Sequence, residues 1–217
     1  MDSMFLAMRE HVRGAFVDSG AHGFDHTLRV TRLCEVLGTE ERADMQILIP
    51  AALFHDIARP IEDETGIPHE VKGALLAEAY LRSIQYPDVF IPGILHAIRA
   101  HRYRSSGVIP GTLEAKVLSD ADKLDAMGAV GIARTFMQAG EEGGGIPDAV
   151  HHINEKLLKL KDRMHTEAAR KIAMRRHAFL LEFLETLEME MGADSDESWR
   201  RLYTGDFKLR LNHNSSL

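Results

Sequence analysis

The stretch LFHDIARP, Leu53 to Pro60, places His55 and Asp56 side by side at the end of an apolar run. Burying an imidazole or a carboxylate is costly unless it is paired with another group or bound to a metal ion. Adjacent residues of a helix diverge by about 100°, so both side chains reach one ion most easily at a helix end. Helical spacing over about 41–57, ending before Pro60, predicts such a position for the pair.

The remaining sequence is typical of an all-α protein. Of its 217 residues 45% are apolar and only 6% aromatic, and Ala, Leu, Glu, Arg and Met are frequent, which favours helices. Asp25 and Gly38 are the expected ends of the second helix, and 61–68 is expected to be an acidic loop. No strand pattern or linker interrupts 1–217, so we expect one domain. Helices are predicted over 3–18, 26–37, 41–57, 69–84, 112–128, 129–139, 148–162 and 166–191, with one more beginning near Pro92.

Charge and composition argue against several classes of function. A formal charge of -7 without a broad basic stripe is a poor match for duplex nucleic acid. The single cysteine, Cys34, excludes an intramolecular disulfide and fits a reducing compartment. The N-terminal segment lacks the apolar core of a signal peptide, and no apolar run reaches the length of a membrane span. We therefore expect a cytoplasmic protein that binds neither a membrane nor duplex nucleic acid.

Further ligand types for a metal ion occur at two distant places. His26 opens the second predicted helix. In VLSDADKLDAMGA, Asp122 and Asp125 share a helix face with apolar residues, so both carboxylates are expected to point inward. Asp120, on another face, is expected at the surface.

The order His26, His55-Asp56 and Asp122, with the segment EAKVLSDADKLDAMGAVGIARTF, resembles the HD-domain superfamily of metal-dependent phosphohydrolases. Within it the chain is most similar to a subgroup of small stand-alone HD hydrolases. The similarity covers about 20–140, and it implies an HD-domain helical bundle that helices over about 148–191 complete or extend. Those C-terminal helices could instead form a homodimer face.

The resemblance implies that these four residues bind a divalent cation and that water activated by the metal attacks a phosphate ester or anhydride. Asp56 would then be catalytic as well as a ligand. The expected substrate is a nucleotide or another small phosphorylated metabolite. Mixed nitrogen and oxygen ligands suit Mn²⁺, Fe²⁺, Ni²⁺, Co²⁺ or Zn²⁺, with Mg²⁺ as a further candidate.

Some members of the superfamily use further histidines after the pair for a second metal, and the candidates here are His69, His96 and His101. His96 and His101 are about 140° apart around a regular helix, so they are not expected to serve one site equally, and we favour His101.

In the nucleotidase branch an acidic residue three positions after the His-Asp pair helps to activate water, but here Arg59 occupies that position. Asp125 or His101 could replace that base, or the metal could suffice without one. Residues that could bind substrate phosphate are Arg59, His69, His96 and Lys123, with Lys72, Arg102 and Arg104 as weaker candidates.

Two other functions remain open at this point. An HD fold could hold a metal or nucleotide as a sensor without catalysis, although an intact ligand set favours an enzyme. Alternatively, a di-iron oxygenase would need His69 and either His96 or His101 as additional ligands.

Overall fold

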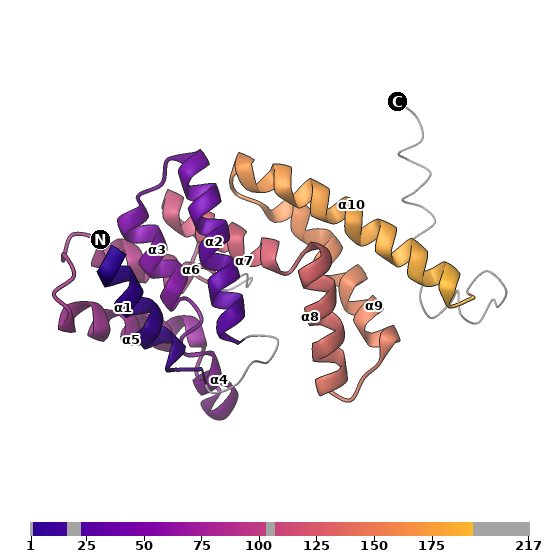
Figure 1. Cartoon of the computed structure of the whole chain (residues 1–217), viewed down its shortest axis with the longest axis horizontal. Coiled ribbons are helices and arrows are strands. Elements are labelled where there is room, and N and C mark those ends of the chain that lie inside the picture. The colour runs from indigo at the N-terminus through magenta and orange to yellow at the C-terminus, as the bar shows by residue number, and fades with distance from the viewer. Residues whose placement is uncertain (1, 17–22, 103–106, 193–217) are drawn as a thin grey trace.

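The structure, a computed structural model, describes residues 2–16, 23–102 and 107–192. Within these ranges the chain forms ten α-helices, one 3-10 helix and no strand, which confirms the all-α prediction (Figure 1). The elements are α1 Asp2–Arg13, α2 Phe24–Glu41, α3 Met45–Phe54, α4 Arg59–Thr65, α5 His69–Ser83, α6 Ile91–Ala100, α7 Leu113–Asp125, α8 Gly128–Glu141, α9 Ile146–Glu155, η1 Leu157–Arg163 and α10 Glu167–Glu190. None of the helices described is long and apolar enough to span a bilayer.

Helix α3 is the centre of the bundle. It contacts α1, α2, α5, α6 and α7, and every residue from Leu48 to Phe54 is buried, as expected for a helix that is apolar on all sides. Pro50 removes the N–H that would bond to the carbonyl of Gln46. The hydroxyl of Tyr86 donates to that carbonyl instead, at 2.7 Å. The helix therefore continues through Pro50 and ends just before the His55-Asp56 pair.

Helices α8, α9 and α10, with η1, lie beside the α1–α7 bundle (Figure 1). Asp120 of α7 fixes the start of α10, because its carboxylate accepts hydrogen bonds from the backbone N–H groups of His165 and Thr166 and from the Thr166 hydroxyl, at 2.8–3.0 Å. Asp120 is fully buried, so the expectation of a surface position was wrong. Its face of α7 is covered by an element distant in the sequence.

Several predicted boundaries also need correction. Helix α2 begins at Phe24 with Gly23 as its N-cap, so Asp25 is not the cap. The helix also runs past Gly38, where Leu48 packs so closely that a Cβ atom would lie 2.4 Å from Leu48 Cδ2.

The expected acidic loop is largely helix α4, whose first turn contains Pro60, a residue suited to that position. The third predicted helix is shorter than 41–57, since Asp44 caps α3 by accepting from the backbone N–H of Gln46 at 2.9 Å. The predicted helix 148–162 is divided into α9 and η1.

Candidate metal centre and substrate cavity

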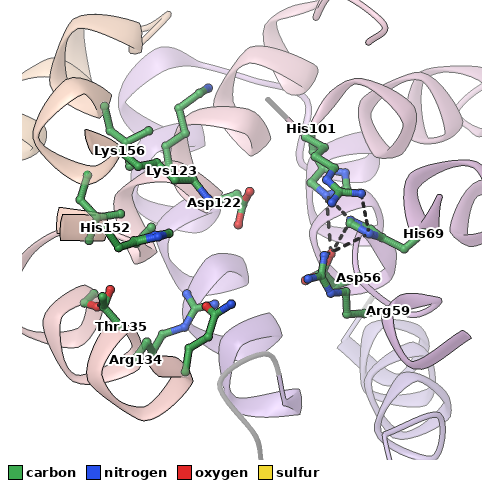
Figure 2. Close-up of a pocket in the computed structure, with 16 residues that line it drawn as sticks. Asp56, Arg59, His69, His101, Asp122, Lys123, Arg134, Thr135, His152 and Lys156 are labelled. Carbon is green, nitrogen blue, oxygen red and sulfur yellow. Dashed lines mark hydrogen bonds and ion pairs between the residues drawn. The ribbon is translucent and has the colours of Figure 1, made fainter. Parts of the chain in front are cut away.

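The carboxylate of Asp56 lies between two pairs of histidines. Its Oδ2 atom is 3.5 Å from Nε2 of His26 and 3.7 Å from Nε2 of His55. Its Oδ1 atom is 3.1 Å from Nε2 of His69 and 3.6 Å from Nε2 of His101 (Figure 2). All five residues are buried, and they come from α2, the turn after α3, the start of α5 and the end of α6.

Asp122 of α7 completes the set of four that the sequence suggested. Its Oδ1 atom is 3.3 Å from Nε2 of His26, and Nε2 of His26 is also 3.3 Å from Nε2 of His55. Metal bonds of about 2.1 Å place neighbouring donor atoms about 3.0–3.5 Å apart around one ion. The donor separations at His26, His55 and Asp56 therefore fit a single divalent cation, and Asp122 lies beside His26 as a further potential ligand.

Each of the four histidines around Asp56 is held in one orientation by its Nδ1 atom. The four contacts join His26 to Asp125 at 2.8 Å, His55 to the Ala52 carbonyl at 2.8 Å, His101 to the Ile98 carbonyl at 2.6 Å, and His69 to Glu62. A carbonyl or carboxylate can only accept, so Nδ1 is the donor and carries the proton. A proton fixed at Nδ1 leaves Nε2 as the atom that would bind a metal ion beside Asp56, the arrangement found in metal-binding histidines.

The electrostatics of the cluster favour a positive charge at its centre. Burial alone would lower the pKa of His26, but the carboxylates of Asp122, Asp125 and Asp56 raise it to about 10. Burial lowers the pKa of His55 to about 4. Burial opposes charge on Asp56, yet His55, His101, His26 and His69 hold its pKa well below the usual range. Carboxylates that hold a proton on His26 would also attract a divalent cation.

A second group of potential ligands shares Asp56 with the first. Asp56, His69 and His101 offer donor atoms within 4.8 Å of one another, as do His26, His55 and Asp56. Nε2 of His69 and Nε2 of His101 are 3.2 Å apart. The residues present therefore suit one cation, or two with Asp56 between them.

A cavity of about 240 Å³ opens onto Asp56 and Asp122. Figure 2 shows Asp56, His69, His101 and Arg59 on one wall, opposite residues of α7, α8 and α9. The positively charged residues that line it are Arg59, Arg102, Lys123, Arg134 and Lys156. A metal centre beside several cations is suited to an anion such as phosphate.

Three predicted phosphate binders have partners at the cavity wall. Nη1 of Arg102 donates to Glu62 at 2.7 Å, and Nη1 of Arg59 lies 3.4 Å from the same carboxylate. Nζ of Lys123 donates to the Ser119 hydroxyl and carbonyl at 2.7 and 3.0 Å, and burial lowers its pKa. Lys72 does not line the cavity, and Arg104 lies outside the described residues.

Two predicted site residues occupy other places. Nε2 of His96 accepts a hydrogen bond from the backbone N–H of Gly111 at 3.0 Å, and His96 does not line the cavity. Its assignment to substrate binding was wrong, because its side of α6 faces the following loop. Asp125 is only 2% exposed and lies behind His26, so the assignment as a base at the reaction site was also wrong.

The sequence did not single out Arg134, His152 or Lys156. Arg134 lies on α8, near the end of the segment that carries the motif, whereas His152 and Lys156 lie beyond that segment, in α9 and just after it. The Gly143–Gly145 stretch joins these two helices.

Comparisons with known proteins agree with this arrangement. A model of the HD domain family matches residues 23–127. YpgQ of Bacillus subtilis is 36% identical over 191 residues, which cover 83% of this chain and 90% of YpgQ. A crystal structure of YpgQ in complex with ADP has a TM-score of 0.72 and 33% identity, over 86% of this chain and 97% of that one.

Two further comparisons extend the similarity, one over most of the chain and one over the HD region. An HD superfamily hydrolase from an uncultured Thermotogales bacterium has a TM-score of 0.67 and 35% identity, over 85% of this chain and 91% of that one. Ribonuclease Y of Desulforudis audaxviator is 32% identical over 107 residues, which are 49% of this chain but 19% of that enzyme. The chain therefore belongs to the HD-domain superfamily of hydrolases.

Proposed function

We propose that this chain is a metal-dependent phosphohydrolase that acts on a nucleotide or another small phosphorylated metabolite. The observation that carries the proposal is the juxtaposition of Asp56, its four surrounding histidines and Asp122 with a cavity lined by five cationic residues. Ligands for a cation and binding groups for a phosphate thus meet in one hollow.

A divalent cation at such a site would lower the pKa of bound water and neutralise charge on the phosphoryl group. The chain's own groups have separate tasks. His26, His55, Asp56 and Asp122 would hold the ion, and Asp125 fixes the ring of His26. Arg102 and Lys156, one on each side of the cavity, would orient the phosphate by charge-assisted hydrogen bonds.

A proton acceptor must be able to reach the cavity. Asp125 cannot, and Arg59 stands where the nucleotidase branch has its acidic residue. His101 lines the cavity and remains the candidate base among the residues that the sequence suggested. His101 is buried, with 2% of its surface exposed.

The relative with bound ADP supports a nucleotide as the substrate class. That structure is described as YpgQ in complex with ADP, and its chain matches this one over most of both lengths. A nucleoside phosphate would suit a cavity that combines cations with the apolar residues Leu157 and Leu160.

One observation also favours a second candidate, a paired-iron oxygenase. Both His69 and His101 lie beside Asp56, which is the arrangement that this alternative requires. Two iron ions per chain and oxygen consumption with an organic substrate would support it. The five cations of the cavity favour hydrolysis of a phosphate compound instead.

The test combines metal analysis with a substrate screen. The purified full-length chain is loaded separately with Mn²⁺, Fe²⁺, Co²⁺, Ni²⁺, Zn²⁺ and Mg²⁺, and is assayed on phosphomonoesters, phosphodiesters and nucleoside triphosphates. We expect hydrolysis with at least one metal, and loss of both metal and hydrolysis in Asp56→Ala. Asp88→Ala, whose side chain is 83% exposed, is the matched control and should change neither.

Two outcomes would contradict the proposal. Full metal content and activity in Asp56→Ala would show that the centre is elsewhere. Tight binding of a nucleotide by the native chain, with no hydrolysis under any metal, would identify a sensor.

A further inference from the structure

A second hollow of about 180 Å³ lies next to the metal-centre cavity, between α8 and α9. Thr135, Gln138 and His152 line both hollows, so the two are adjacent. Figure 2 shows Thr135 and His152 on the wall opposite Asp56. A ligand bound at the metal centre could therefore extend into this space, which we call the α8–α9 recess; its lining is Thr135, Gln138, Ala139, Glu142, Gly144, Asp148, Ala149 and His152.

The recess and the larger cavity differ in charge. Five Lys or Arg residues line the cavity, but the described lining of the recess includes none. Its charged residues are instead Glu142 and Asp148, which are exposed at its rim, above the buried Thr135, Ala139 and Ala149. Carboxylates would repel a phosphate, so a substrate is oriented with its phosphate at the metal centre and an uncharged end in the recess.

The hydrogen-bonding groups of the recess are mainly acceptors. The amide nitrogen of Gln138 donates to Oε1 of Glu142 at 2.9 Å. Because a carboxylate only accepts, this contact fixes the amide and leaves its carbonyl oxygen for a ligand. The Thr135 hydroxyl donates to the Gly131 carbonyl at 2.8 Å, so only its lone pairs remain.

His152 is the exception, since it can also donate. Burial lowers the pKa of His152, and neighbouring Lys156 lowers it further, so the ring is neutral near pH 7. A neutral imidazole offers one donor and one acceptor and adds no charge that would attract phosphate. The recess thus favours an uncharged group that donates hydrogen bonds.

We propose that the α8–α9 recess binds the nucleoside end of the substrate and that the carbonyl oxygen of Gln138 accepts a hydrogen bond from it. This inference rests on the proposed function, and it identifies Gln138 as a specificity-determining residue. The donor is either an exocyclic amine of the base or a hydroxyl of the sugar. Glu142 is a positioning residue, because it holds the Gln138 amide without needing to touch the ligand.

Equilibrium binding to the metal-loaded full chain can test this without requiring turnover. One pair of ligands is AMP and IMP, which differ in the exocyclic amine, because IMP presents a carbonyl there. The other pair is AMP and dAMP, which differ in a sugar hydroxyl. We expect the native chain to prefer AMP by roughly 10-fold in at least one pair, since a lost donor leaves an acceptor unpaired.

Three variants test whether the preference for AMP arises in the α8–α9 recess. Gln138→Met keeps the length of the side chain but removes the carbonyl, and it should reduce the ratio of the two Kd values to near 1. Glu142→Ala should reduce the ratio partly, by releasing the amide. Glu141→Gln, on an exposed neighbouring residue of α8 outside the recess, should leave it unchanged.

The following results would overturn either this inference or the proposed function. Equal Kd values in both pairs for the native chain, or an undiminished preference in Gln138→Met, would overturn the inference. A preference that depends on Gln138 in a chain that hydrolyses no phosphate compound would leave the recess in place and refute the proposed enzyme.

Discussion

Nδ1 of His26 lies 2.8 Å from Oδ2 of Asp125, so a carboxylate outside the cavity sets the orientation of a candidate metal ligand. Asp125 also accepts from Arg29 at 2.8 and 3.0 Å and from Arg134 at 2.7 Å. One buried side chain therefore connects α2, α7 and α8 at the rear of the metal centre.

Removing this carboxylate is expected to weaken metal binding without removing a ligand. Asp125→Asn should lower metal affinity about 10- to 100-fold, the usual effect of losing the partner of a ligating histidine. Asp125→Ala should lower it more. Titration of the metal-free chain with Mn²⁺ measures the effect, and Asp25→Ala, on an exposed residue of α2, is the control. Unchanged affinity in both Asp125 variants would show that His26 needs no such support.

Lys156 is expected to contribute to substrate binding rather than to chemistry. It lines the cavity from the wall opposite Asp56 (Figure 2). Lys156→Gln should raise KM several-fold with little change in kcat, because it removes a cation that acts on the bound anion at every stage. The matched control is Lys159→Gln, since Lys159 pairs with Glu155 outside the cavity lining. A fall in kcat at constant KM would refute this role.

Gly131 is expected to be essential for the turn between α7 and α8. A Cβ atom there would lie 2.1 Å from the carbonyl oxygen of Ala126, which is backbone and cannot rotate away. Gly131→Ala should therefore reduce the free energy of unfolding by roughly 1–3 kcal/mol or more, as overpacking does. Denaturant unfolding measures the change.

Gly140 provides the contrast within the same helix. Nothing lies within 4 Å of a Cβ atom built there, so Gly140→Ala should raise stability by about 1 kcal/mol or less through helix propensity. Equal effects of the two substitutions would contradict the close approach at Gly131.

Asp120 is expected to be important for stability and not for metal binding. Its carboxylate accepts from two backbone N–H groups and the Thr166 hydroxyl, all at the start of α10. Asp120→Ala leaves the N–H and hydroxyl of the buried Thr166 without this partner, at a cost of about 1–3 kcal/mol for each unsatisfied group. Its unfolding midpoint should fall well below that of Asp162→Ala, a substitution of a side chain that is 70% exposed. A normal midpoint for Asp120→Ala would show that α10 does not depend on this cap.

The sequence predicted the helical class correctly, and the set of four metal ligands stays a prediction. Burial of His55 could be expected from the sequence, because this residue follows an apolar helix that is buried on all sides. His26, Asp56 and Asp122 followed from the motif order, and the structure places His26 and Asp56 beside His55 and Asp122 beside His26. The single-domain organisation stays a prediction, as do the homodimer face and the cytoplasmic location.

The errors share a physical cause, which is tertiary contact. Asp120 and Asp125 are both polar residues on one helix, and periodicity could not show that α10 would cover one while His26 covered the other. The end of α6 directs His101 toward Asp56, whereas His96 bonds to Gly111, and the role of His101 stays a prediction. The recess between α8 and α9 could not be predicted, since its residues have no motif and meet only when those two helices pack.

The most direct test of the central claim is a crystal of the metal-loaded chain measured at the absorption edge of Mn or Fe. We predict an anomalous peak within bonding distance of Nε2 of His26, Nε2 of His55, Asp56 and Asp122. A second peak beside His69 and His101 would indicate a two-metal centre. An active, metal-loaded chain whose anomalous density lies away from Asp56 would contradict the account.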